Sequence, residues 1–395
     1  MRRGPFGLNV AQLPASAPQR MRRILVASLL VLALAARDAR AQQVERFPRP
    51  QLDSKADTND WEAYFDYGVK LIKDRPSAAE AGFYWAQRLA PNRAEPLVAH
   101  WVAFHMRDYG RWERYVKGDD PRITNDPQIV AHDSLRWRAR ARNPFVSEGL
   151  VYYLYDALPG YWGDDAATRG FLYYSGAKFP QAVDAYRIDV KHGARKHPWK
   201  RWSLAQALVG ARRFPEALAQ VDSLCAALDS ASARTTSSYE SKEVLDLGAA
   251  MLHQVLGDTA EARLAAERGL TENFAFYPAH TFLGELARSS RDMEGALREF
   301  ELAAQLAPND AAVMYDYGSA LAFRGQIEPA LAAMRKATAL EPYYALPWLG
   351  IARVLDATHD AEGARAAYQA YLDRAPRSSA REIAAARDRI AALAR

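Results

Sequence analysis

Histidines are the side chains of this chain best suited to bind a metal or to transfer a proton near neutral pH. Two metal ligands on one helix face need a spacing near four, because a helix turns once every 3.6 residues. The pairs His100/His105 and His192/His197 are five apart, and no HExxH pattern occurs. The sequence therefore predicts ordinary helix or loop histidines and no metal site. The other four are His132, His253, His280 and His359.

The nucleophilic residues also lack suitable partners. His132-Asp133-Ser134 contains the residue types of a hydrolase triad, but triad members come together from distant segments. The single cysteine, Cys225, lies on an apolar helical phase, which favours a buried small side chain over a reactive or bridging thiol. Neither a GxSxG elbow nor a glycine-rich phosphate loop occurs. We predict no catalytic residue, no cofactor and no enzymatic activity.

Aromatic residues are concentrated in the stretch 145–174. Aromatic rings are good ligand anchors because they bury a large area at a low entropic cost. The stretch is therefore either a groove for a peptide or glycan, or the packing between irregular helix pairs. The residues are Phe145, Tyr152, Tyr153, Tyr155, Tyr161, Trp162, Phe171, Tyr173 and Tyr174.

Basic residues form two clusters. Arg136, Arg138, Arg140 and Arg142 alternate with apolar residues, and on a helix the pairs 136/140 and 138/142 fall on different faces. The second cluster has only Asp189 as an opposing charge. A solvated helix face and a surface for an anionic partner are the two interpretations. The second cluster contains Arg187, Lys191, Arg195, Lys196, Lys200 and Arg201.

The composition is that of a folded protein without a basic surface for nucleic acid. The 395 residues are 49% hydrophobic and 25% charged, which supports a large core. The net charge of +5 comes from residues 1–41, which contain seven arginines and one acidic residue. The remaining 45 basic and 46 acidic residues nearly balance, so we predict no nucleic-acid partner.

Residues 1–41 have the features of a secretory signal. Met21-Arg22-Arg23 precedes thirteen apolar residues at 24–36, and Ala39-Arg40-Ala41 provides a small-x-small cleavage pattern. Thirteen helical residues cover roughly 20 Å, which is too short for a bilayer core of about 30 Å. We expect translation to start at Met21, cleavage after Ala41, and a periplasmic or secreted bacterial protein with no membrane span in the mature chain. An uncleaved anchor is the alternative.

A pattern with a period of 34 residues fills the C-terminal half. Pro308, Pro342 and Pro376 each end a set that begins with a small residue and has a small and a large residue 12 and 16 positions later. The residue 19 positions after the first is small in two sets and is Tyr371 in the third. The sets are Gly284, Ala296, Phe300, Ala303; Gly318, Ala330, Met334, Ala337; and Ala352, Ala364, Tyr368, Tyr371.

Each position in this set has a physical role. Small residues let two antiparallel helices approach closely, and the large residue fills the space toward the next pair. Proline ends the second helix because it has no N–H and clashes with the preceding turn. Weaker copies begin at Ala250, Ala205, Gly170 and near Gly68.

This pattern resembles the tetratricopeptide repeat family over roughly residues 60–378. The resemblance implies an all-α fold, a right-handed solenoid of antiparallel helix pairs. The expected organisation is a signal peptide (1–41), an extended linker (42–59), divergent repeats (60–163) with an insertion (117–126), degenerate repeats (164–241) with a loop (230–238), regular repeats (242–378) and a capping helix (379–395).

The resemblance also implies a non-catalytic scaffold whose groove, lined by the first helix of each pair, binds a peptide or protein. The Lys and Asn set with which one subclass holds chaperone C-termini is absent from these positions. The alternative function is a carbohydrate- or cell-wall-associated module of an envelope or export complex that uses the stretch 145–174. The candidate groove residues are Trp199, Trp202, Gln206, Thr281, Phe282, Glu285, Arg288, Tyr315, Asp316, Ser319, Phe323, Leu349 and Arg353.

Overall fold

The structure, a computed structural model, describes residues 47–107, 127–146, 165–229 and 241–394, with the backbone alone for 127–133. The chain divides into two compact units, 1–47 and 48–395, and all the helices described below belong to the second. The expected leader, the insertion at 117–126 and the loop at 230–238 lie outside the described residues.

The described residues form 17 α-helices and one short 3₁₀ helix, and none of these residues is in a strand. The helices are α2 (Trp61–Leu71), α3 (Pro76–Leu89), α4 (Glu95–Arg107), α7 (Pro127–Arg142), α8 (Ala166–Ser175), α9 (Phe179–Gly193), α10 (Lys200–Gly210), α11 (Phe214–Asp229), α12 (Lys242–Leu256), α13 (Thr259–Glu272), α14 (Tyr277–Ser289), α15 (Met293–Leu306), α16 (Ala311–Phe323), α17 (Ile327–Leu340), α18 (Ala345–Ala357), α19 (Ala361–Leu372), η5 (Arg377–Ser379) and α20 (Ala380–Leu393).

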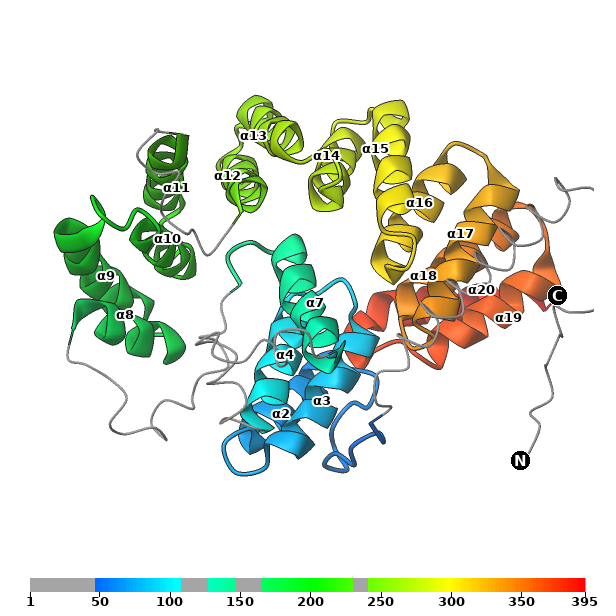
Figure 1. The fold of residues 1–395 in the computed structure, drawn as a ribbon. Coiled ribbons are helices and arrows are strands. Elements are labelled where there is room, and N and C mark those ends of the chain that lie inside the picture. The colour runs from blue at the N-terminus through cyan, green and yellow to red at the C-terminus, as the bar shows by residue number, and fades with distance from the viewer. Residues whose placement is uncertain (1–46, 108–126, 147–164, 230–240, 395) are drawn as a thin grey trace, which may run out of the picture. The chain divides into compact units, whose positions relative to one another are not determined.

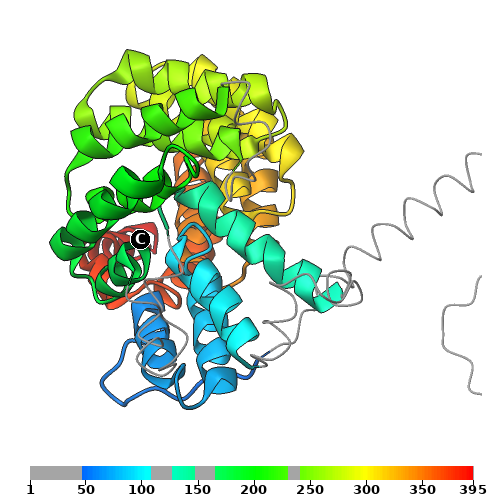
Figure 2. The ribbon, with the colours of Figure 1, turned by 60° about the vertical axis from the view of Figure 1, so that its left-hand side comes forward.

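Consecutive helices pack on one another from α2 to α7 and again, as antiparallel pairs, from α8 to α19 (Figures 1 and 2). The pairs α8–α9, α10–α11, α12–α13, α14–α15, α16–α17 and α18–α19 follow one another without interruption, and α20 packs on α19. The predicted all-α, tetratricopeptide-like solenoid is confirmed. We call α10, α12, α14, α16 and α18 the first helices of their pairs.

The small residue and the large residue 16 positions later contact each other directly, because they lie on the two helices of one pair. A Cβ placed on Gly318 would lie 2.8 Å from Met334 Cγ, and one on Gly284 would lie 2.9 Å from the Phe300 ring. Met334 Sδ is also 2.9 Å from the Cβ position of Gly350 in the next pair. The large residue therefore packs both on its own first helix and on the following one.

The turn inside each regular pair contains a residue in the left-handed region, again at intervals of 34. Gly257 and Gly325 adopt φ of 89° and 73°, and Arg291 and His359 adopt 64° at the equivalent positions. Glycine takes this conformation without the steric cost that a side chain imposes. Gly257 and Gly325 therefore suit these turns, whereas Arg291 and His359 adopt the same conformation with a side chain.

We expect Gly318→Leu to lower the free energy of unfolding by about 1–3 kcal/mol, because the new side chain overpacks the contact with Met334. Urea unfolding followed by circular dichroism measures the change. Ala332→Leu, on the exposed face of α17, is the matched control and should change the midpoint little. An unaltered midpoint for Gly318→Leu would show that the two helices do not meet closely there.

Candidate partner-binding surface

The predicted groove residues occupy equivalent positions on successive first helices. Glu285, Ser319 and Arg353 are 34 residues apart on α14, α16 and α18. Each is the ninth residue of its helix, so the three form a row across the three helices. We call Glu285, Arg288, Asp316, Ser319, Phe323 and Arg353 the α14–α18 row.

Three of the predicted groove residues are buried in the protein's own core. Trp202 stacks on Phe145, with ring centroids 5.1 Å apart and an interplanar angle of 22°. Gln206 is buried on the same helix, and Leu349 belongs to the core around α18 and α19. This placement departs from the expectation of an open groove, because pairing of the helices and the segment after α7 cover these side chains.

Four further candidates are half-buried. Phe282 packs against the core, and the Tyr315 ring lies 6.0 Å from that of Tyr344, edge to face. Thr281 donates its hydroxyl proton to the carbonyl of Tyr277 at 3.2 Å, one turn earlier. Trp199 precedes α10 and is also half-buried. Their bulk therefore contributes to packing as well as to the surface.

The α14–α18 row contains the accessible candidates. Phe323 is 71% exposed, and Arg288 and Arg353 are exposed. Glu285 and Arg288 form an ion pair with each other across one turn of α14. The row therefore presents an aromatic ring, both signs of charge and, at Ser319, a hydroxyl whose proton is donated to Tyr315 O at 2.8 Å.

Asp316 is the most electrostatically perturbed residue of the row. Burial, together with the nearby Glu285 carboxylate, raises the pKa of its carboxyl group to about 7, although Arg142 and Arg288 act in the opposite direction. The side chain has no hydrogen bond or ion pair within the described part of the chain. A carboxyl group that changes charge near neutral pH thus lies beside the exposed residues of the row.

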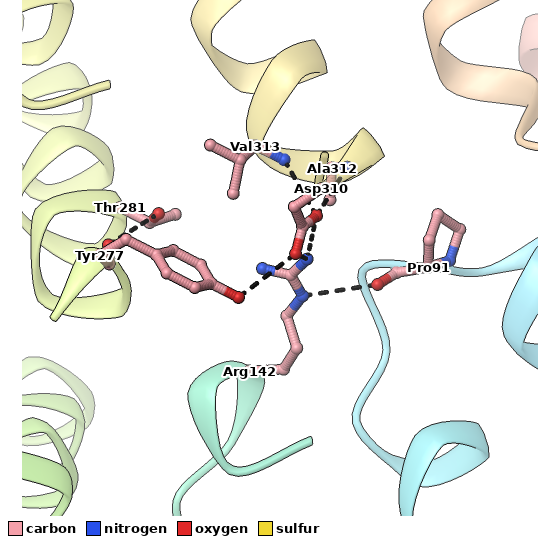
Figure 3. A network of polar contacts seen from close by, with 7 residues as sticks. All are labelled: Pro91, Arg142, Tyr277, Thr281, Asp310, Ala312 and Val313. Carbon is pink, nitrogen blue, oxygen red and sulfur yellow. Dashed lines mark hydrogen bonds and ion pairs between the residues drawn. The ribbon is translucent and has the colours of Figure 1, made fainter. Parts of the chain in front are cut away.

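Arg142, at the end of α7, joins three parts of the protein (Figure 3). Its guanidinium forms a two-oxygen ion pair with Asp310, and its Nε donates to the carbonyl of Pro91 at 3.4 Å. Asp310 also caps α16 by accepting from the amides of Ala312 and Val313. Tyr277, which begins α14, donates its hydroxyl proton to the same carboxylate at 3.3 Å.

The pKa values in this network follow from burial and from the ion pair. Burial by itself would raise the pKa of Asp310, but the adjacent Arg142 holds it below its ordinary value. Burial and the Asp310 carboxylate raise the pKa of Tyr277 to about 12. At neutral pH the network therefore contains a carboxylate, a guanidinium and a neutral phenol.

The alternating arginines of α7 do not form a solvated face. Arg142 is buried against Asp310, Arg140 is also buried, and Arg136 lies over the Trp101 ring at 5.3 Å from its centroid. The solvated-face interpretation fails here, because packing of α7 on α4 and the pairing of Arg142 with Asp310 enclose these side chains.

The second basic cluster is also partly neutralised. Lys200 pairs with Asp189, and Arg187 pairs with Glu216 at 2.7 Å. Lys191, Arg195 and Lys196 are exposed. The cluster is therefore a set of local ion pairs with three additional surface charges.

The aromatic stretch lies only partly within the described residues, since 147–164 are outside them. Phe145 and Tyr174 are buried, and Phe171 packs against the core. Tyr173 is 37% exposed. The described rings therefore mainly pack between helices.

Sequence reasoning did not identify a buried polar cluster between α3 and α4. Glu80 is fully buried, 3.3 Å from Arg107 and 3.8 Å from His100 Nε2. His100 Nδ1 is 3.0 Å from Gln87 Oε1. Charged groups at such depth are paired, and these pairs join the two helices.

The chemistry available elsewhere is limited. Burial raises the pKa of the half-buried Cys225 thiol to about 12, which makes it a poor nucleophile at neutral pH. Within the described ranges, no three His, Cys, Asp or Glu side chains are arranged to hold a metal ion. Nor does any described helix have the length and apolar character needed to cross a bilayer.

Comparisons with known proteins find similarity among solved structures. No protein-family model matches the chain, and no curated protein matches it. YrrB, described as a TPR protein with an unusual peptide-binding site, is 19% identical over 49% of this chain and 93% of its own, with a TM-score of 0.39. Yeast Tom70 is 12% identical over 96% and 76%, with a TM-score of 0.45. A tetratricopeptide repeat protein from Parabacteroides merdae is 12% identical over 85% and 99%, with a TM-score of 0.38.

We expect Asp316→Asn to reduce the loss of stability that accompanies rising pH. Between the ordinary value of 3.8 and about 7, the folded protein retains a proton on Asp316 that the unfolded chain releases. Its contribution to stability is thus complete at low pH and is lost as the pH rises through this window. The asparagine side chain does not ionise and has no such dependence.

The free energy of unfolding in urea is measured at about pH 5 and about pH 8 for the wild type and the variant. The change between the two pH values is then compared. Asp388→Asn, at an exposed position on α20, is the control and should behave as the wild type. Equal pH dependence of wild type and Asp316→Asn would show that Asp316 ionises normally.

Proposed function

We propose that this protein is a non-catalytic scaffold that binds a peptide or protein partner along the α14–α18 row, and that it acts after export to the bacterial envelope. The observation that carries the proposal is the placement of exposed side chains on successive first helices. Phe323 is 71% exposed, and Arg288 and Arg353 are exposed on the neighbouring first helices.

Packing does not account for the Phe323 side chain. Gly318 on the same helix meets the second helix of the pair, whereas Phe323 lies largely in solvent. A surface that presents an exposed aromatic residue together with arginines has the composition of a binding hot spot, because the ring can bury a large area and the arginines can pair with polar groups. This composition favours a polypeptide partner.

The described aromatic residues of 145–174 support the scaffold over a carbohydrate-binding module. A sugar-binding site needs rings open to solvent, but Phe145 and Tyr174 are buried. Export rests on the leader alone, whose cationic, apolar and small-x-small segments are those of a signal peptide.

Phe323→Ala combined with Arg353→Ala is expected to weaken partner binding by at least about 2 kcal/mol, roughly 30-fold, with little change in melting temperature. The partner is first captured from envelope fractions with the wild type and identified by mass spectrometry. Its affinity for each variant is then measured by titration.

Phe274→Ala is the matched control for this experiment. Phe274 is 65% exposed but lies before α14, outside the row, so its removal should leave the affinity unchanged. Equal affinity of the row variant and the wild type, with both folded, would place the partner surface elsewhere.

Export predicts a mature protein that begins at Gln42. Intact mass measurement of the protein purified from the envelope or medium tests this prediction. Ala39→Trp removes the small residue of the cleavage pattern and should leave the precursor uncut. A purified wild-type protein that still begins at Met1 or Met21 would contradict it.

A further inference from the structure

The segment from Arg136 to Val146 contacts the first helices of four successive pairs. Phe145 stacks on Trp202 of α10 and would meet a Cβ at Gly248 of α12 at 3.1 Å. The Trp137 ring lies 5.5 Å from that of Tyr277 at the start of α14, and Arg142 pairs with Asp310 at the start of α16. We call this segment, 136–146, the bridging segment.

A second set of contacts joins the N-terminal pair to the C-terminal pair. Arg88 of α3 pairs with Glu341, just before α18, at 3.0 Å, and each side chain is 19% exposed. The Trp85 and Tyr343 rings are 5.0 Å apart. The guanidinium of Arg49 lies over both rings, at 5.0 and 5.5 Å from their centroids.

Backbone groups complete the junction. Asn59 Nδ2 donates to the carbonyl of Asp373 at 3.0 Å, and the Asp57 carboxylate accepts from the amide of Arg377 at 2.5 Å. These residues lie more than 300 positions apart in sequence. The first pair and the last pair are therefore connected directly, in addition to their connection through the repeats.

The contacts are complementary in charge. The bridging segment and α3 contribute arginines, whereas the first helices and the residues just before them contribute Asp310 and Glu341. Arg142 also lies close enough to lower the pKa of Asp316, which belongs to the α14–α18 row. The bridging segment is thus adjacent to the proposed partner-binding row.

We propose that the bridging segment is an intramolecular ligand of the first-helix surface, and that the Arg88–Glu341 contact holds it in place. The surface accepts the C-terminal end of a basic helix. Its arginine, here Arg142, pairs with Asp310, and the aromatic residue three positions later, here Phe145, stacks on Trp202. Being part of the same chain, the segment binds at a high effective concentration and excludes a competitor of the same chemistry.

The proposal extends the proposed function, because it names the chemistry that this surface recognises next to the α14–α18 row. Its test uses the protein's own segment and needs no external partner. A failure here is thereby distinguishable from a failure of partner binding at the row.

The experiment measures binding of a fluorescein-labelled synthetic peptide of residues 134–146 to the full mature chain by anisotropy. The variant Arg142→Glu/Phe145→Ala, in which the internal segment has lost its contacts with Asp310 and Trp202, should bind the peptide at least about tenfold more tightly than the wild type. A peptide with Arg142→Glu is the control and should not bind. A variant that folds, shown by circular dichroism, but does not bind the peptide would overturn the proposal.

A second variant keeps the bridging segment intact. Arg88→Glu places two carboxylates opposite each other and should increase peptide binding, whereas Arg88→Glu/Glu341→Arg restores the ion pair and should return it to the wild-type level. Each side chain is only 19% exposed, so circular dichroism checks that Arg88→Glu is folded, and the charge-reversed double variant controls for the loss of the pair. Equal peptide binding by the wild type and Arg88→Glu would show that this contact does not hold the segment.

Discussion

The ion pair between Arg142 and Asp310 is the interaction that connects the separate parts of this protein. Burying a guanidinium or a carboxylate costs several kcal/mol unless each finds partners, and removing one partner leaves the other charge uncompensated. Here the pair is completed by the Tyr277 hydroxyl, the Pro91 carbonyl and the first amides of α16. The same carboxylate thus caps a helix, neutralises an arginine and joins α7 to two repeats.

The repeats provide the surface on which this connection is made. Each regular pair has a small residue opposite a large one, as Gly318 and Met334 show, and Met334 also contacts Gly350 of the next pair. A solenoid of this kind is stabilised by nearest-neighbour interfaces. The direct contacts between α3 and the residues before α18 add long-range connections that an open repeat array lacks.

The bridging segment divides the first-helix surface into an occupied and an accessible part. Trp202 and Asp310 are covered by the protein's own bridging segment, while Phe323, Arg288 and Arg353 are left to solvent. Asp316 lies between the two parts, and burial raises the pKa of its carboxyl group to about 7. Recognition at the row and release of the bridging segment are therefore expected to influence each other.

The sequence by itself determined the helix pairs, because the spacing of small, large and proline residues reflects local contacts within one period of 34. It also predicted that residues 34 positions apart on α14, α16 and α18 share a face, since they occupy equivalent repeat positions. Only the tertiary structure decided which of those positions are covered. Trp202 is buried because Phe145, 57 residues earlier in the chain, stacks on it, and Arg142 is buried because Asp310, 168 residues away, neutralises it. Such pairings depend on how distant segments meet, and no periodicity along the chain encodes them.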